Sequence, residues 1–343
     1  MQFGIFGSAQ ANSGDLGPET GQGFRDYLDL AVEAEHLGFK SSFLVEHHFT
    51  GWHQVSATLM LQTALAMRTT RLRLGTAVIV LPWHNPVLLA EQAATLDQIS
   101  GGRLDFGIGK GYRHSEFHGF RVPPEEADAR FEESVEVMTR AFTSRQRFSH
   151  SGKFWQFDDI VVEPPPAQQP QPPFWVAAAS EASIKRAARR GFNLILDQYA
   201  SPEDHGRRIA LYRAEREASG HKFDPLQVAV ARQVYVADSK AEAEAALKRA
   251  ALYTQRTVDV SRVPGSDVKG SHVLSYAGTP GGTEANTLFD TPDRICEKLE
   301  ALRRAGVAYV LLTPMGAREQ LRRFARDIMP AFADGERAES ARV

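Results

Sequence analysis

The sequence has a single cysteine, Cys296, among its 343 residues. One cysteine cannot form a disulfide within the chain, and its isolation excludes thiolate zinc sites, iron–sulfur clusters and Cys-x-x-Cys redox chemistry. We expect Cys296 to be a helix residue beside Ile295 and Leu299. Any redox chemistry of this chain would therefore need a bound organic cofactor.

The sequence also lacks an excess of one charge and lacks long apolar runs. Forty Lys and Arg residues balance 42 Asp and Glu residues, for a formal charge of −2. This balance argues against a nucleic acid or an anionic membrane as partner and favours small ligands. No apolar run approaches the ~20 residues of a membrane span. Met1–Gln10 has no basic segment followed by an apolar core, so we expect a soluble, cytoplasmic protein.

Apolar runs alternate with amphipathic helical stretches along the chain, which is the pattern of βα units around a parallel sheet. The expected strands are Phe3–Gly7, Ser41–Val45, Leu72–Leu81, Leu104–Ile108, Phe174–Ala178, Phe192–Leu196, Leu226–Val236 and Tyr309–Thr313. The expected helices are Gly23–Leu37, Ser56–Met67, Pro86–Ile99, Pro124–Phe142, Glu181–Arg190, Pro202–Ser219, Lys240–Tyr253, a helix starting at a Thr291 cap, and Gly316–Ile328. Eight such units predict one α/β domain over residues 1–343, a (β/α)8 TIM barrel. A doubly wound open sheet is the alternative, because periodicity does not report closure.

Two segments interrupt this rhythm and are interpreted as insertions. Residues 143–173, which end in the proline-rich Glu163–Pro173, are expected to form an ordered excursion. Residues 257–289 are rich in glycine and are expected to form a long mobile loop that acts as a lid.

In a barrel of this kind, chemistry collects where strands end. Glu46, His47 and His48 directly follow the second strand. Side chains alternate in an extended segment, so Glu46 and His48 share one face and His47 takes the other. The neutral imidazole of a histidine at this position is suited to proton transfer near pH 7. A metal site is disfavoured because adjacent histidines diverge, and a purely structural role at the barrel mouth is the alternative.

Glycines mark the end of the fourth strand, in Gly107-Ile108-Gly109-Lys110-Gly111-Tyr112. They permit close backbone approach, and Lys110 is placed to meet a phosphate, although a tight turn without a ligand explains the same run. The Gly-x-Gly-x-Gly spacing does not match a dinucleotide fingerprint, and we expect no helix start in Arg113–Pro123.

A second candidate anion site follows the fifth strand, in Ala179-Ser180-Glu181-Ala182-Ser183. Ser180 is a good N-cap, and a helix start with two hydroxyls is suited to an anion. An ordinary cap is the alternative. Glu181 would repel a dianion unless its side chain turns outward.

Together these segments resemble the bacterial luciferase-like family of flavin-dependent monooxygenases, specifically its two-component, FMNH2-using branch. The resemblance spans nearly the whole chain. Its most specific pieces are Leu44–Phe49, Gly75–Pro82, Asp97–Arg103, Gly109–Tyr112 and Ala179–Ser183.

The resemblance implies a barrel that binds reduced FMN (FMNH2), delivered by a separate NAD(P)H:flavin reductase, and that reacts it with O2 to a C4a-hydroperoxyflavin. His47 matches the histidine that assists this chemistry, with Glu46 beside the flavin and His48 as the third catalytic candidate. Ala77–Val78 matches a cis peptide against the ring. The implied cofactor-binding residues are Ala77, Val78, Gly109, Lys110, Tyr112, Ala179, Ser180, Glu181 and Ser183. Related members are commonly dimers, so a homodimer is expected.

The expected substrate is a small, apolar organic molecule of the aldehyde or ketone class. Aromatic residues are expected near the barrel mouth, namely Phe6, Phe49, Trp52, Trp83 and Tyr112. Light emission is not implied, because Gly109 stands where the light-emitting subunits carry a reactive cysteine. Two alternatives remain, a hydride-transfer enzyme that uses the deazaflavin F420 and a non-catalytic flavin-binding subunit.

Overall fold

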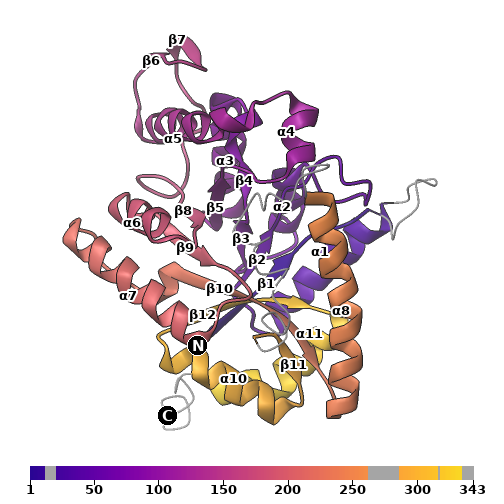
Figure 1. Cartoon of the computed structure of the whole chain (residues 1–343). Coiled ribbons are helices and arrows are strands. Elements are labelled where there is room, and N and C mark those ends of the chain that lie inside the picture. The colour runs from indigo at the N-terminus through magenta and orange to yellow at the C-terminus, as the bar shows by residue number, and fades with distance from the viewer. Residues whose placement is uncertain (12–20, 262–285, 316, 334–343) are drawn as a thin grey trace, which may run out of the picture.

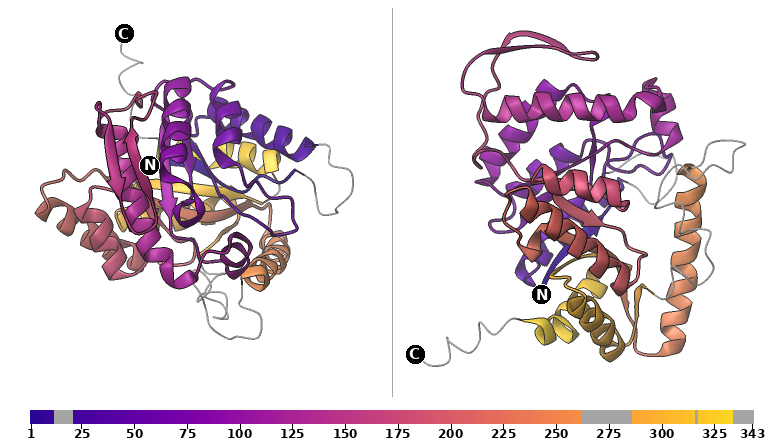
Figure 2. Two further views of the ribbon diagram at one scale, coloured as in Figure 1. Left: turned by 90° about the horizontal axis from the view of Figure 1, so that it is seen from above. Right: turned by 60° about the vertical axis from the view of Figure 1, so that its left-hand side comes forward.

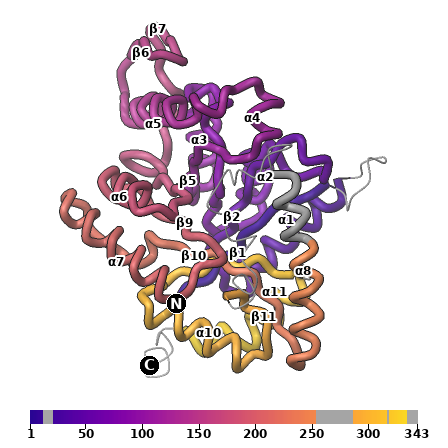
Figure 3. Tube along the Cα trace, in the orientation of Figure 1, coloured from indigo at the N-terminus to yellow at the C-terminus, as the bar shows by residue number. Residues whose placement is uncertain are grey.

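Eight parallel strands close into a barrel in this computed structural model, which describes residues 1–11, 21–261, 286–315 and 317–333 (Figures 1 and 3). The strands are β1 (Gln2–Gly7), β2 (Ser41–Leu44), β3 (Arg73–Thr76), β5 (Leu104–Gly109), β8 (Phe174–Ala177), β9 (Asn193–Leu196), β10 (Val228–Val236) and β12 (Tyr309–Pro314). Each strand pairs in parallel with the next along the chain, and β12 pairs with β1. The predicted TIM barrel is thus confirmed, and the open-sheet alternative is wrong.

Helices between successive strands cover the outside of the sheet (Figure 2). They are α1 (Gln22–His36), α2 (Thr58–Ala66), α3 (Pro86–Ser100), α4 (His114–Phe120), α5 (Ala127–Thr143), α6 (Glu181–Arg189), α7 (Pro202–Ala218), α8 (Lys240–Ser261), α10 (Pro292–Arg304) and α11 (Ala317–Asp327). Short 3-10 turns lie at Leu81–Trp83, Pro124–Glu126, Pro225–Gln227 and Met329–Phe332. No helix in these ranges combines the length and the apolar character that a membrane span requires.

Local sequence explains how α3 begins and ends. The Asn85 side chain accepts hydrogen bonds from the N–H groups of Val87 and Leu88, and Pro86 occupies the first turn. The helix ends at Gly101, whose φ of 67° is the left-handed conformation that glycine adopts at low cost. The cap expected at α10 is weaker than predicted, because the Thr291 side chain makes no capping hydrogen bond.

The expectation that no helix begins in Arg113–Pro123 is wrong, because α4 occupies His114–Phe120. The helix is only seven residues long and carries Gly119, so its sequence gives little periodic signal. Its stability comes from tertiary packing, in which Phe117 is buried with Val122, Ala127 and Trp83.

The long strand expected at Leu72–Leu81 is divided in two. Its first part is β3, its second part is β4 (Ile79–Val80), and the cis Ala77–Val78 peptide bond separates them. Both parts pair with β5.

Residues 143–173 contain the antiparallel pair β6 (Phe148–Ser151) and β7 (Gln156–Ile160), which projects beyond α5 (Figures 1 and 2). Of the loop expected at 257–289, residues 257–261 are the last residues of α8, and residues 288–289 begin β11 (Leu288–Asp290), which pairs with β10. The predicted loop boundaries are therefore wrong at both ends. Residues 262–285 lie outside the described residues, and the lid interpretation stays a prediction.

Two apolar layers stabilise the barrel. The larger one lies between the sheet and its helices. A smaller cluster comprises Phe43, Trp175, Ile195, Ala229, Tyr309 and Leu311. The Phe43 and Trp175 rings meet edge to face at 5.4 Å. Because all barrel strands are parallel, the residues that follow β2, β3, β5, β8 and β9 gather at one end of the barrel.

Candidate active site

Glu46 is the centre of a buried network at the end of β2. The residue is 2% exposed, and its carboxylate accepts hydrogen bonds from His48 Nε2 at 2.9 Å, Trp83 Nε1 at 3.0 Å and His84 Nε2 at 2.9 Å. Burial alone raises the pKa of Glu46, but the hydrogen bonds from His48, His84 and Trp83 outweigh it and lower the pKa to about 2. Glu46 is therefore an anion at neutral pH, and both histidines donate to it through Nε2–H.

His47 points away from Glu46 and contacts Glu116, which α4 supplies. Its Nδ1 lies 3.0 Å from Glu116 Oε1, and the same oxygen accepts the backbone N–H of His48 at 2.9 Å. Glu116 is 1% exposed. The opposite orientations of His47 and His48 confirm the predicted alternation of side chains. When His47 Nδ1–H donates to Glu116, the lone pair of its Nε2 is left for chemistry.

Burial keeps His47 neutral. It lowers the pKa of the imidazole, the hydrogen bond that His47 donates to Glu116 acts in the opposite direction, and the nearby Arg113 cation lowers the pKa further. A neutral imidazole with one nitrogen fixed by a carboxylate is arranged to accept a proton at the other nitrogen.

The Ala77–Val78 peptide bond is cis, as the resemblance predicts. The glycines of β5 make room for this segment. A Cβ at Gly107 would lie 1.7 Å from the Thr76 carbonyl oxygen, and one at Gly109 would lie 2.4 Å from Val78 Cγ2. The glycine run therefore has a packing cause, because only glycine lets β5 approach the end of β3 so closely.

Lys110 and Tyr112 follow β5. Lys110 is exposed and its Nζ lies 2.8 Å from Asp128 Oδ1. Tyr112 meets the His47 ring edge to face at 6.4 Å. The structure thus brings Tyr112 to His47, whereas Lys110 is held by an acidic residue of α5.

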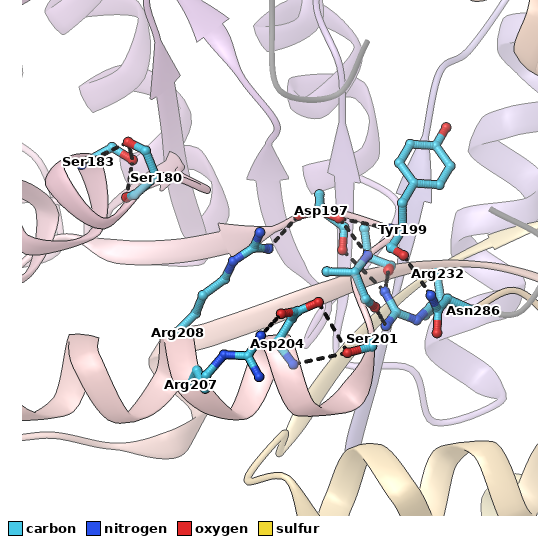
Figure 4. Close-up of polar contacts among 12 residues, drawn as sticks. Ser180, Ser183, Asp197, Tyr199, Ser201, Asp204, Arg207, Arg208, Arg232 and Asn286 are labelled. Atoms are coloured by element: carbon cyan, nitrogen blue, oxygen red, sulfur yellow. Dashed lines mark hydrogen bonds and ion pairs between the residues drawn. The ribbon is translucent and has the colours of Figure 1, made fainter. Parts of the chain in front are cut away.

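Ser180 caps α6, as its sequence predicts. Its Oγ accepts the N–H of Ser183 at 3.3 Å and donates to Ser183 Oγ at 2.9 Å. Ser183 Oγ in turn donates to the Ser180 carbonyl at 2.8 Å. Ser180 is exposed and Ser183 is half-buried, and the two side chains point toward each other (Figure 4). Glu181 forms an ion pair with Lys185 at 2.6 Å, so its charge is compensated along the helix. Within the described part of the chain, no hydrogen bond links these residues or their neighbour Ala179 to Lys110.

Three residues of the mouth are not among the catalytic or binding candidates that the sequence predicts: His84, Arg113 and Glu116. His84 follows β4, while Arg113 and Glu116 belong to a segment that was not expected to be helical. Hereafter the mouth network means Glu46, His47, His48, His84 and Glu116. Within the described ranges, no group of three or more His, Cys, Asp or Glu residues is arranged to hold a metal ion.

An aromatic cluster borders the mouth network. Trp83 stacks on Phe120 at 5.1 Å, and Phe120 meets His48 at 4.8 Å and Phe49 at 4.9 Å. Phe49 is 58% exposed and Phe120 36% exposed. Apolar rings thus connect the buried Glu46 region with the surface.

A second polar network locks the β9 turn, residues 197–201. Asp197 accepts the N–H groups of Tyr199 and Ala200, each at 2.9 Å, and an ion pair from Arg208 at 2.6 Å. Arg232 donates to the carbonyls of Asp197, Ala231 and Ala200 (Figure 4). Burial raises the pKa of Asp197, but its hydrogen bonds from Tyr199, Arg208 and Ala200 lower it overall.

Comparison with known proteins gives a match over most of the chain. Residues 1–309 match the family model described as luciferase-like monooxygenase. The chain is 32% identical over 219 residues to an uncharacterized protein of Sinorhizobium fredii, which covers 64% of this chain and 62% of that protein.

Two other relatives align over nearly their full length. The chain is 26% identical over 336 residues to the oxygenase component of a flavin-dependent trigonelline monooxygenase of Acinetobacter baylyi, covering 91% of each chain. It is 27% identical over 336 residues to an FMNH2-dependent dimethylsulfone monooxygenase of Pseudomonas putida, covering 92% of this chain and 89% of that one.

Solved structures share the fold. The monooxygenase RslO1 from Streptomyces bottropensis superposes with a TM-score of 0.79 at 28% identity, covering 97% of this chain and 100% of that one. The oxygenating constituent of 3,6-diketocamphane monooxygenase from Pseudomonas putida, in complex with FMN, gives 0.79 at 20% identity, covering 96% and 98%. An F420-dependent secondary alcohol dehydrogenase gives 0.76 at 20% identity, covering 97% and 99%. At 20% identity the last two show the fold alone.

Proposed function

This chain belongs to the luciferase-like monooxygenase family, and on that premise we propose that it is an FMNH2-dependent monooxygenase of a two-component system. It takes reduced flavin from a separate NAD(P)H:flavin reductase and transfers one oxygen atom of O2 to a small organic substrate of the aldehyde or ketone class. The names of the trigonelline and dimethylsulfone monooxygenases support the reaction type and the cofactor.

The observation that carries the proposal is the His47–Glu116 pair. Glu116 fixes His47 Nδ1 at 3.0 Å, and burial keeps the ring neutral. His47 Nε2 is then the atom that takes a proton from the reacting group and returns it. Glu46 acts behind this pair, because its buried carboxylate holds His48 and His84 in fixed orientations.

The residues fit an FMN. The hydroxyls of the exposed Ser180 and the half-buried Ser183 lie at the start of α6, and Lys110 with Ala179 would complete a phosphate site. The Glu181 charge does not oppose a phosphate, because Lys185 compensates it. Ala77, Val78, Gly109 and Tyr112 would flank the ring. When bound, reduced FMN supplies the two electrons for O2 activation.

The aromatic cluster supports an apolar substrate body. Phe49, Trp83 and Phe120 form a continuous set of rings beside Glu46, and the partly exposed Phe49 and Phe120 lie at its outer edge. Such rings favour flat or apolar molecules and exclude water from the reacting atoms.

We also propose a homodimer. Four large apolar side chains are exposed at the neighbouring helices α2 and α3, namely Met60 in α2, Met67 directly after its last residue, and Leu88 and Ile99 in α3. Exposed apolar side chains on adjacent elements are typical of protein interfaces. Sedimentation equilibrium tests the proposal, which predicts twice the chain mass, and a monomer at micromolar concentration would contradict it.

The function is tested by supplying FMNH2 through a flavin reductase under 18O2 with a panel of aldehydes and ketones. The expected result is one labelled oxygen atom per product. Parallel anaerobic titrations with FMNH2 and reduced F420 address the alternative cofactor. Tight binding of F420 with no labelled product would overturn the proposal in favour of hydride transfer, and flavin binding without turnover of any panel member would favour the non-catalytic subunit.

A further inference from the structure

Arg113 is a buried guanidinium whose hydrogen bonds are not satisfied. The residue is 2% exposed, and both its Nε and its Nη1 are buried without a hydrogen-bond partner. Arginine stays protonated in proteins and carries five N–H donors. An unpaired buried charge is among the most costly features a fold can contain.

The other buried arginines of the described chain show how the fold normally treats this side chain. Arg232 is 1% exposed and donates to three backbone carbonyls. Arg216 is 6% exposed and donates to two carbonyls and the Tyr212 hydroxyl. Arg113 is therefore as buried as Arg216 and Arg232 but lacks the hydrogen-bond acceptors that these two arginines have.

The nearest acidic side chain along the sequence does not neutralise Arg113. Glu116 Oε1 accepts from His47 Nδ1 and from the His48 N–H, and no ion pair joins Glu116 to Arg113. The cation is thus left without a counter-charge among the residues that the structure describes.

The position of Arg113 is next to the proposed reaction centre. Its guanidinium lies 5.8 Å from the centre of the Tyr112 ring, and the same ring meets His47. The Arg113 charge also acts on His47, whose pKa it lowers. A third donor of this segment, the Ser115 hydroxyl, is likewise buried without a partner. Three unsatisfied donor atoms within three residues indicate that a hydrogen-bond acceptor is missing.

We propose that Arg113 anchors a carboxylate group of the substrate beside His47, so that the substrate is an aldehyde or ketone that also carries an acid group. This inference rests on the proposed function and adds a substrate class to it. A carboxylate matches the planar guanidinium because it accepts two parallel N–H bonds. The apolar body of such a molecule would face the aromatic cluster.

The test uses sodium acetate as the carboxylate probe and the flavin-free protein. Thermal unfolding is followed with increasing acetate at constant ionic strength, with chloride as the balancing anion and acetamide as the neutral probe of similar shape. We expect acetate, and not acetamide, to raise the unfolding temperature of the native protein in a saturable way.

Three variants make the result specific to Arg113. Arg113→Met should weaken the apparent acetate affinity by about tenfold or more, because a charge-assisted hydrogen bond is lost. Arg113→Lys should keep part of the effect, because it keeps the charge without the planar fork. The control Arg121→Met, an exposed arginine at the end of α4, should respond to acetate as the native protein does. An Arg113→Met variant that loses stability yet keeps the acetate response would overturn the proposal, as would a native protein that acetate does not stabilise.

A second arm separates the substrate from the flavin, whose reduced ring and phosphate are also anionic. Anaerobic titration with FMNH2 should give similar affinities for the native protein and Arg113→Met. A tenfold loss of FMNH2 affinity in Arg113→Met would assign the anion to the flavin and overturn the substrate proposal. Because the acetate arm contains no flavin, it can fail while the monooxygenase activity stands, and it can succeed if that activity is absent.

Discussion

Two polar networks lie at the same end of the barrel and differ in how completely their hydrogen bonds are satisfied. In the β9 turn, Asp197 and Arg232 are each bonded to backbone groups on several sides. In the mouth network, Glu46 is fully bonded, but His47 uses only Nδ1, and the adjacent Arg113 has two unpaired nitrogens.

This difference separates a network that shapes a loop from one that is open to a ligand. Buried polar groups that satisfy one another rigidify the chain. Buried groups that keep unused bonding capacity lower stability and are retained at sites of function. The β9 turn is accordingly a scaffold, whereas the mouth network with Arg113 is where a substrate is expected.

The largest effect is expected for His47→Ala. Removal of a positioned acid–base group slows the chemical step by about 10²- to 10⁴-fold. FMNH2 affinity should change far less, since His47 does not belong to the phosphate site. Single-turnover oxygenation and anaerobic titration measure the two quantities. His118→Ala, at an exposed histidine of α4, is the control, and equal losses of rate and affinity in His47→Ala would contradict the assigned role.

A substitution in the β9 turn should lower the free energy of unfolding and should not change the rate of oxygenation in the folded protein. Asp197→Ala leaves Arg208 without its ion-pair partner and removes the negative charge near Arg232. Breaking a buried pair from one side costs about 3–5 kcal/mol of unfolding free energy. Urea denaturation measures this loss. The exposed pair of Arg213 and Glu217 gives the control, in which Glu217→Ala should cost less than about 1 kcal/mol. If Asp197→Ala kept the native stability but lost oxygenation, the β9 turn would belong to the reaction site and not to the scaffold.

Glu116→Gln should slow oxygenation by about 10- to 100-fold, because a hydrogen bond to a charged group contributes about 1.5–3 kcal/mol. The pH profile distinguishes positioning from folding. The hydrogen bond that His47 donates to the Glu116 carboxylate raises the pKa of His47, so the loss of that carboxylate should move the acid limb of the profile to lower pH. A slower enzyme with an unshifted limb would show that Glu116 has only a structural role.

The smallest expected effect concerns His205, a fully buried residue of α7 whose two ring nitrogens lack partners. Burial, assisted by the Arg232 charge, lowers its pKa from 6.5 to about 3. Between these values the unfolded chain binds a proton that the folded chain refuses, so stability falls as the pH falls.

From pH 7 to pH 5 this single group removes about 2 kcal/mol, at about 1.4 kcal/mol per pH unit. His205→Leu should abolish that part of the loss, whereas His118→Leu should not. Urea denaturation at the two pH values measures it. An identical pH dependence in native protein and His205→Leu would refute the assignment.

The barrel was predictable because each strand is a short apolar run followed by a helix with its own start and stop signals. The prediction that Glu46 and His48 lie on the same face followed from the alternation of side chains in an extended segment alone. Glu116 was not predictable in the same way, because it meets His47 from 69 positions away on a seven-residue helix held by tertiary packing. Arg113 was not predictable as a binding residue either, because its burial and its lack of hydrogen-bond partners depend on the tertiary structure.

The glycines of β5 indicate a close approach of the backbone, but the sequence does not show which segment approaches it. The Gly107–Gly109 run reads as a close approach of backbone to some partner. The partner proved to be the segment around the cis Ala77–Val78 bond, which no local pattern identifies.

The central claim, that this barrel activates O2 on reduced FMN beside His47, is tested most directly by stopped-flow spectroscopy. The protein is loaded anaerobically with FMNH2 and then mixed with O2. The account predicts that a long-lived flavin–oxygen absorbance precedes the appearance of oxidised FMN. Reoxidation in one step at the rate of free flavin, with intact protein and bound FMNH2, would contradict it.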